Sequence, residues 1–321
     1  MKLNSQVHSH DGFFKNIFCR TKEAGQFMDK MLPEKIRKKI DVKTLHIEKD
    51  SFIDKDLKEY YSDILYTCNC KNRKGSFQIS LLFEHKSKKS DYVRFQLLQY
   101  LSLYYNTLIK NKKEIVVLIP VIFYHGKENW EIKKIEELIP DFDPDFRCYL
   151  PKFEIVFINL RKYSDKQIKD IFTSLSLQMS LLVMKHIFDE KTLFNKLSYY
   201  FRELPQLLET EYGREIFRII LIYLYYNHKK NAKEIAESIN EISSKGGTIA
   251  MTTAEQLISE GEKRGEKRGE KRGEKRGEKR QKYQVAKKMI EEGFKDEMIH
   301  KISGIPLEEV ERLRNGHKNN E

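Results

Sequence analysis

The spacing of hydrophobic residues changes twice along the first half of the chain. Residues 11–31 place phenylalanine and isoleucine at helical spacing and predict one or two opening helices, and residues 91–110 return to that spacing. Between them, residues 42–86 alternate with a period of two, most clearly in SFQISLLFEH, and predict strands. Two continuous apolar runs, at 115–124 and 153–160, are typical of strands covered on both faces. This order predicts an α/β fold, a mixed sheet flanked by helices.

The second half of the chain is predicted to be helical. Aromatic and aliphatic stripes at helical spacing run from about residue 166 to 240 and predict an extension packed on the first domain, and SSKGG (243–247) predicts a break after it. We therefore expect four parts: an α/β domain at 1–162, a helical extension at 163–245, a charged linker at 246–281 and a small helix-turn-helix-like segment at 282–321.

Five consecutive copies of Gly-Glu-Lys-Arg fill residues 261–280. A glycine at every fourth position costs about 1 kcal/mol each relative to alanine in a helix. Because like residues recur at i,i+4, only Lys-to-Glu pairs at i,i+3 compensate, so a helix here is expected to be marginal. We interpret the tract as a solvated spacer grown by repeat expansion, with a DNA-contacting arm as the alternative.

The last forty or so residues carry three short helical patterns, QVAKKMIEEG, FKDEMIHKI and PLEEVERLR, with a turn at 303–305. Ile302, Ile305, Val310 and Leu313 would give this segment a small core. Its last helix is rich in glutamate, which a base-reading helix facing phosphates would avoid. A homo-oligomer formed through these C-terminal helices is therefore at least as well supported as DNA reading.

The charge balance favours nucleic acid as the partner. The chain has 60 Lys and Arg against 48 Asp and Glu, a net charge of +12, and a pI near 9.2. It has neither an apolar stretch of the roughly 18 residues that a spanning helix needs nor the apolar run of a signal peptide. Its four cysteines form no CxxC pair. We expect a cytoplasmic protein with no membrane partner, disulfide framework or structural zinc.

The runs YYSDILYTCNC and SFQISLLFEHKS, joined by a polar turn with a glycine, predict a hairpin. If the turn centres near residues 73 and 74, Ile64 faces Phe83 and the shared face is wholly apolar. The same register sets Asp63 directly opposite Glu84 on the other face, and Lys86, two residues on, shares that face.

Two carboxylates in directly opposed positions need a compensating charge. Their β-carbons would be about 4.5–5.5 Å apart, where like charges destabilise a sheet. A divalent cation such as Mg²⁺ or Mn²⁺ would compensate them, and an adjacent lysine could orient or deprotonate a water and steady a phosphate, an arrangement suited to phosphodiester hydrolysis. The alternative is that Asp63 and Glu84 are exposed sheet charges, with Lys86 neutralising one of them. A register slip of one residue would also separate them.

The predicted hairpin has a carboxylate at the end of one strand and Glu-X-Lys at the end of the next. This arrangement is similar to the PD-(D/E)XK nuclease pattern. Six segments extend the match: HDGFFKNIF (10–18), YSDILY (61–66), LLFEHKS (81–87), FQLLQYL (95–101), IPVIFYHGKENW (119–130) and MTTAEQLISEGEKRG (251–265). Together they resemble the Rpn family of recombination-promoting nucleases, also described as transposase-like. The resemblance implies a PD-(D/E)XK core at 1–162 and a DNA endonuclease that depends on Mg²⁺, Mn²⁺ or Ca²⁺, with a role in recombination or in defence against mobile DNA.

The resemblance assigns roles position by position. Asp63 and Glu84 match the two metal ligands, and Lys86 matches a catalytic position where many family members have glutamine. Asp11 and Lys15 stand in the opening His-Asp…Phe-Lys motif and are interpreted as site-supporting, with an i,i+4 helix ion pair as the alternative. Gln96 and Gln99 follow the catalytic strand, where the superfamily often places an auxiliary polar group.

Other single residues that invite a functional interpretation are assigned to the fold. His125, after a buried strand, is expected to bond backbone with its ring rather than act as a general base, and His10 and His85 call for the same caution. Trp130 is expected to be a packing anchor.

Three functions remain open at this point. The first is an endonuclease that cuts double-stranded DNA with little sequence preference. The second is a catalytically silent DNA-binding or assembly protein that keeps the fold. The third is a transposase, which ranks last because the sequence offers no separate acidic triad for strand joining.

Overall fold

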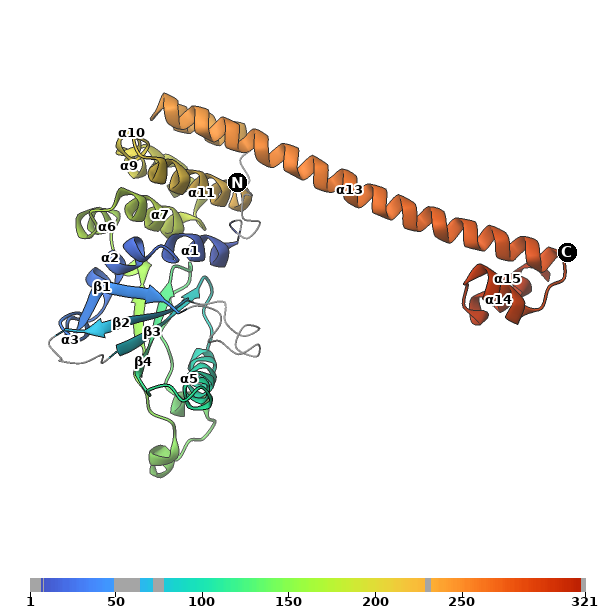
Figure 1. The fold of residues 1–321 in the computed structure, drawn as a ribbon. Helices are drawn as coiled ribbons and strands as arrows, with labels where there is room; N and C mark the ends of the chain where they lie inside the picture. The colour runs from blue at the N-terminus through green and yellow to red at the C-terminus, as the bar shows by residue number, and fades with distance from the viewer. Residues whose placement is uncertain (1–6, 8, 49–63, 72–77, 229–231, 319–321) are drawn as a thin grey trace. The chain divides into compact units, whose positions relative to one another are not determined.

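The computed structural model describes residues 7, 9–48, 64–71, 78–228 and 232–318 (Figure 1). Asp63 lies outside the described residues. Contacts within the chain form two units, Met1–Ala254 and Glu255–Glu321, and each is described by itself. Among the described residues, no helix is both long and apolar enough to cross a membrane.

A five-stranded mixed sheet lies at the centre of the first unit, in the order β1-β2-β3-β4-β5. The first three strands are antiparallel neighbours, and β4 and β5 continue the sheet in parallel. The strands are β1 (Ile40–Ile47), β2 (Ile64–Cys70), β3 (Gln78–Lys86), β4 (Val117–Tyr124) and β5 (Val156–Asn159). This mixed sheet with flanking helices confirms the predicted α/β class.

The register of the predicted hairpin is confirmed over the described residues. Ile64 pairs with Phe83, Tyr66 with Leu81, and the ladder continues to Asn69 opposite Gln78. Described pairing between β2 and β3 therefore stops one residue short of Asp63, and the predicted pair of Asp63 and Glu84 stays a prediction.

One face of the sheet is covered by α1 (His10–Phe18) and α2 (Thr21–Met31). These helices begin where the sequence changes to helical spacing, and Ser9 caps α1 by accepting a hydrogen bond from the Gly12 amide. Their buried phenylalanines pack on phenylalanines of β3 and β4, with ring centroids 4.9–5.8 Å apart. The cluster consists of Phe14, Phe18, Phe27, Phe83 and Phe123.

The opposite face of the sheet is covered by α5 (Val93–Lys110) (Figure 1). The buried side of α5 packs with apolar residues of β2 and β4 and with Trp130 in one core cluster. The Trp130 and Tyr124 rings meet in a T-shaped, edge-to-face contact. The expectation that Trp130 is a packing anchor is confirmed. Glu84 extends from β3 toward this helix-covered face.

Further helices pack against α1 on the side away from the sheet (Figure 1). The contacts run from α1 to α7 and α11. The helices of this layer are α6 (Asp165–Ile171), α7 (Leu175–His186), α8 (Glu190–Asn195), α9 (Leu197–Tyr200), α10 (Leu204–Leu207), α11 (Glu211–Asn227) and α12 (Ala232–Asn240). The short helical elements elsewhere in the unit are α3 (Glu34–Arg37) and the 3₁₀ turns η2 (Glu136–Leu138), η3 (Pro144–Tyr149) and η4 (Leu160–Lys162).

An ion-pair network centred on Asp165 ties α6 to α7 and α9. Its Oδ1 is 2.6 Å from Lys185 Nζ and 2.8 Å from His186 Nε2, and its Oδ2 is 3.1 Å from Lys196 Nζ. Burial alone would raise the pKa of the Asp165 carboxyl, but these hydrogen bonds hold it well below its ordinary value. The ionised carboxylate is therefore favoured by folding.

Asp165→Asn is expected to lower the free energy of unfolding at pH 7 by about 2 kcal/mol, because charge-assisted hydrogen bonds are lost. A carboxyl whose pKa is lowered on folding stabilises above its unfolded pKa, so the difference between wild type and variant should shrink below about pH 4. Urea unfolding across pH measures this. Asp170→Asn, an exposed position on the same helix, is the control, and an equal effect of both changes would refute the role of the network.

The second unit contains most of α13 (Ser244–Glu291), then α14 (Asp296–Ser303) and α15 (Leu307–Lys318). Gly304 ends α14 in a left-handed conformation, φ 69°, at the predicted turn. Ile305 and Val310 are buried as predicted, but Ile302 is exposed and Ile299 takes its place in the core. The structure leaves oligomerisation through these helices as a prediction.

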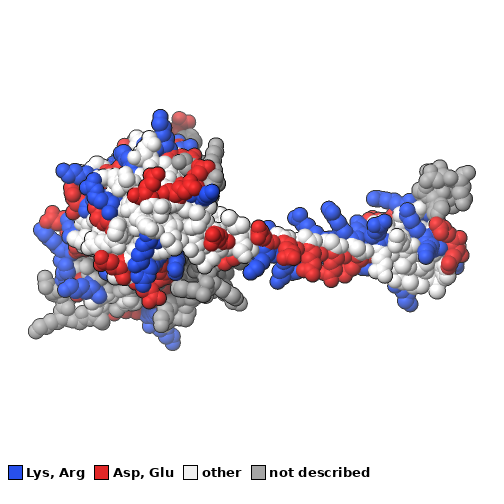
Figure 2. Space-filling model, turned by 90° about the horizontal axis from the view of Figure 1, so that it is seen from above, with Lys and Arg blue, Asp and Glu red and all other residues white. Residues whose placement is uncertain are grey.

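The Gly-Glu-Lys-Arg repeats lie within α13, and all of their residues are exposed. Figure 2 shows a band of Glu along one side of this helix and Lys and Arg projecting from the other. The predicted domain boundaries at 162, 245 and 281 stay predictions. The two units of the structure meet after Ala254.

Candidate active site

Glu84 and Lys86 lie at the carboxyl end of β3, on the face that α5 covers. The period of two puts both side chains on one side of the strand, as predicted. The Glu84 side chain is fully buried, and Lys86 Nζ is 2.5 Å from its Oε1. The alternative of an exposed sheet charge is therefore wrong for Glu84, although its neutralisation by Lys86 is observed.

Gln96, in the first turns of α5, connects the two charged groups. Its Nε2 donates to Glu84 Oε1 at 3.0 Å, and its Oε1 accepts a hydrogen bond from Lys86 Nζ at 3.0 Å. Gln96 Nε2 also donates a hydrogen bond, at 2.6 Å, to the hydroxyl of Tyr100, which lies one turn further along the helix. The structure thus brings Gln96 to Glu84 and Lys86, while Gln99 is exposed and has no described contact with either.

Tyr100 is a neighbour of the site that sequence reasoning missed. It falls among the apolar residues at helical spacing in 91–110, a pattern that indicates packing and gives no sign of a polar role. Its i,i+4 spacing from Gln96 was the available signal. Burial, with a contribution from Glu84, raises the pKa of the Tyr100 hydroxyl to about 12, so it remains a hydrogen-bonding neutral group.

The environment of Glu84 raises the pKa of its carboxyl. Burial is the main cause, and the charge of Asp11 adds to it, while Lys86 and Gln96 oppose the rise. A carboxyl with a raised pKa is protonated at less acidic pH than an exposed one. Any reaction that needs the carboxylate should therefore decline as pH falls through this raised pKa.

Glu84 Oε2 is buried and has no hydrogen-bond partner among the described residues. A buried carboxylate oxygen without a donor is unfavourable unless a cation or another group satisfies it. Glu84 therefore fits one ligand position of a divalent ion. The described residues contain no group of three or more His, Cys, Asp or Glu that could hold a metal, and Asp63, the second predicted ligand, lies outside them.

A pocket of about 310 Å³ opens beside the end of β3. Lys86, 20% exposed, reaches it together with Asp11. Asp11 Oδ2 is 3.3 Å from Lys15 Nζ, so the alternative interpretation of these two residues, an i,i+4 helix ion pair, is observed, and Asp11 also lines this pocket. The remaining lining residues are His85, Ser87, Lys88, Lys89 and Ser90. The pocket thus combines the carboxylate of Asp11 with several lysines, and Glu84 is not among its lining residues.

The histidines of the motifs lie on the opposite face of the sheet from Glu84. His125 is fully buried, and its Nδ1 is 2.9 Å from the Met184 carbonyl, which confirms the expectation of a backbone-bonded ring. Burial lowers its pKa to about 3 and that of His85, stacked 4.9 Å away, well below the ordinary value. His125 packs behind the end of β3, whereas His85 also lines the pocket of Lys86, with its Nδ1 3.9 Å from Asp11 Oδ1.

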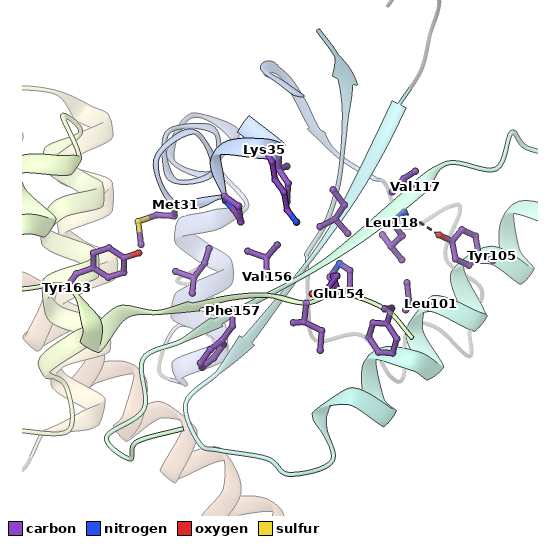
Figure 3. Close-up of a pocket in the computed structure, with 17 residues that line it drawn as sticks. Met31, Lys35, Leu101, Tyr105, Val117, Leu118, Glu154, Val156, Phe157 and Tyr163 are labelled. Carbon is purple, nitrogen blue, oxygen red and sulfur yellow. Dashed lines mark hydrogen bonds between the residues drawn. The ribbon is translucent and has the colours of Figure 1, made fainter. Parts of the chain in front are cut away.

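A second pocket, of about 680 Å³, lies beside β4 and β5 (Figure 3). Its walls are mainly apolar, and Lys35 and Glu154 are its charged lining residues. Neither Glu84 nor Lys86 lines it, so it is separate from the candidate active site.

Comparison with known proteins identifies relatives over nearly the whole chain. A family model described as "Putative transposase, YhgA-like" matches residues 8–215. Recombination-promoting nuclease RpnA of Escherichia coli K12 is 27% identical over 304 residues, covering 94% of this chain and 95% of that protein. RpnD of E. coli O157:H7 is 31% identical over 40% of this chain and 50% of its own length.

A third relative carries a different description. The protein named inactive recombination-promoting nuclease-like protein RpnE, of E. coli K12, is 25% identical over 90% of this chain and 92% of its own length. No solved structure matches the chain.

Proposed function

This chain belongs to the YhgA-like transposase family, and from that membership we propose that it is a divalent-metal-dependent DNA endonuclease that acts in recombination. The observation that carries the proposal is the buried carboxylate of Glu84, which has one oxygen bonded by Lys86 and Gln96 and the other without a described partner. The names of the relatives support a nuclease role. The metal, the endonucleolytic cut and low sequence preference are our extension.

Asp63 and Glu84 would hold the ion in this proposal. When bound, a divalent ion supplies Lewis-acid polarisation of the scissile phosphodiester. Mg²⁺, Mn²⁺ and Ca²⁺ all prefer oxygen ligands, which suits two carboxylates. Asp63 enters through the sequence resemblance and through its place next to Ile64, the last described partner in the β2–β3 ladder.

Lys86 and Gln96 would position the reacting groups. Lys86 holds a positive charge at the pocket beside Glu84, where it would steady a phosphate and orient the attacking water. Gln96 bonds both partners and keeps the ammonium and the carboxylate in fixed relative positions. Asp11 and Lys15 at the rim would support the site electrostatically.

Double-stranded DNA is the proposed substrate because the chain carries a net charge of +12 and lysines surround the pocket. The test is nicking of supercoiled plasmid by the purified full chain with Mg²⁺, Mn²⁺ or Ca²⁺, and with a chelator in place of metal. We expect nicking that requires the ion and shows little preference between plasmid sequences. Equal nicking in excess chelator would contradict the metal requirement.

A catalytically silent DNA-binding protein is the second candidate, and the relative named inactive favours it. Salt-dependent DNA binding without cleavage under any of these ions would support that candidate instead. The family's description also names transposases. A strand-joining reaction would need a further acidic cluster, and the described residues contain none.

Gln96→Met is expected to shift the acidic limb of the pH–rate profile to higher pH. The amide hydrogen bond opposes the raised pKa of Glu84, so its loss raises that pKa further while methionine keeps the side-chain volume. Cleavage rates measured from acid to neutral pH report the shift. Gln206→Met, at an exposed position of α10, should leave the profile unchanged, and an unchanged profile in Gln96→Met would contradict the assigned role.

A further inference from the structure

The helix that carries Gln96 has two distinct faces. Its buried stripe packs on the sheet and contains Val93, Leu97, Tyr100, Tyr104 and Leu108. About 180° around the helix lies an exposed stripe at the same spacing. It consists of Tyr92, just before the helix, and Phe95, Gln99, Ser102, Asn106 and Ile109. Gln99 is about 60° around the helix from Gln96, so this face adjoins the candidate active site.

The exposed face of α5 is unusually free of charge for this protein. Charged residues make up 34% of the chain, yet none occurs between Arg94 and Lys110. Tyr92 is 69% exposed, Phe95 is 42% exposed and Ile109 is 63% exposed. Solvated helix faces normally carry charges, whereas apolar and uncharged hydrogen-bonding side chains together are typical of a contact surface.

Lysines stand at both ends of this neutral face. Lys88 and Lys89 are exposed with Asp91 in the segment before the helix, and Lys110, Lys112 and Lys113 are exposed with Glu114 at its other end, so lysines outnumber carboxylates at both ends. A helix of 18 residues is about 27 Å long, which spans about eight base pairs of duplex at 3.4 Å each. Phosphate-binding cations at the ends and amide and hydroxyl groups between them form the arrangement of a groove-reading helix.

We infer that the exposed face of α5 lies along a groove of duplex DNA, with Gln99 and Asn106 toward base edges and the terminal lysines toward phosphates. The inference rests on the proposed nuclease function and deepens it by naming the surface that receives the substrate. The major groove, about 12 Å wide, admits a helix, and amide side chains both donate to and accept from base edges, so these contacts do not require one base and agree with the low sequence preference proposed above. Phe95 supplies an apolar contact in the groove.

Charge distinguishes DNA from a second copy of the chain as the occupant. Both ends of the α5 face carry lysines, so pairing it with the same face of another copy brings cations together in either relative orientation. A polyanion complements both ends at once. Self-association through this face is therefore disfavoured.

The test is the affinity of the full chain for a 20-base-pair duplex, measured by fluorescence anisotropy in excess chelator so that no cleavage occurs. Gln99→Glu with Asn106→Glu places two carboxylates against the DNA and should weaken binding at least about tenfold. Asn195→Glu with Gln206→Glu adds the same charge at exposed positions of α8 and α10. That control should change affinity less than about twofold.

Each outcome decides the inference. If both double variants lose DNA affinity equally, or if the α5 variant loses none, the inference about the α5 face is overturned while the nuclease proposal stays intact. A wild-type chain that binds no duplex overturns both. A change in the oligomeric mass of the α5 variant, with DNA affinity unaltered, assigns the face to self-association. If circular dichroism shows that the α5 variant is unfolded, Gln99→Ala with Asn106→Ala replaces it, with an expected loss of about fivefold.

Discussion

Replacing Glu84 by glutamine is expected to slow DNA cleavage roughly 1,000-fold, a loss of about 4 kcal/mol in transition-state stabilisation. The amide keeps the shape of the side chain but removes the charge that would hold a divalent ion and that pairs with Lys86 at 2.5 Å. Single-turnover cleavage of a labelled duplex measures the rate. The affinity for DNA in chelator should be unchanged or slightly tighter, because a negative charge is removed.

Glu154→Gln is the matched control for this substitution. Glu154 is exposed and lines the separate pocket beside β4 and β5, so the same chemical change there should leave the cleavage rate within about twofold. Cleavage by Glu84→Gln at the wild-type rate would show that the buried carboxylate takes no part in the reaction.

Phe18→Ala is expected to lower the free energy of unfolding by about 3–5 kcal/mol. The Phe18 ring is fully buried, with its centroid 4.8 Å from that of Phe14, 5.0 Å from Phe27 and 5.1 Å from Phe83. Its removal leaves a cavity between α1, α2 and the sheet that these rings cannot all move to fill. Because domains are stable by only about 5–15 kcal/mol, this is a large effect.

The matched substitution is Phe146→Ala, at a side chain that is 59% exposed. It should change the free energy of unfolding by less than about 0.5 kcal/mol. Urea titrations of both variants followed by circular dichroism give the two values. If the two variants lost the same stability, the aromatic cluster would not be the core that holds the opening helices to the sheet.

The strands and their register were predictable because they depend on local pattern. Alternating apolar residues and a polar turn defined the β2–β3 pairing, and it is found at Ile64 opposite Phe83. The placement of Glu84 and Lys86 on one face follows from the same period of two. The full burial of Glu84 was not predictable, since it results from α5 covering that face, which a two-strand pattern does not contain.

Glycine shifted the position of the break predicted in the helical half. The break at SSKGG is present but lies at residues 241–243, between α12 and α13, so Gly246 and Gly247 are inside α13. A Cβ at Gly246 would lie 2.8 Å from Leu204 Cδ2, and one at Gly247 would clash with the Asn240 side chain, so both positions permit close packing rather than interrupt the helix. Such tertiary constraints are invisible in a local composition pattern.

Glu84 and Asp63 are proposed to hold a divalent ion together. The most direct measurement is Mn²⁺ binding followed by electron paramagnetic resonance, on the full chain and on Glu84→Gln and Asp63→Asn. We predict a single Mn²⁺ site in the wild type whose affinity falls at least about 100-fold in each variant and is unchanged in Glu154→Gln. Wild-type affinity for Mn²⁺ in both carboxylate variants would contradict the claim.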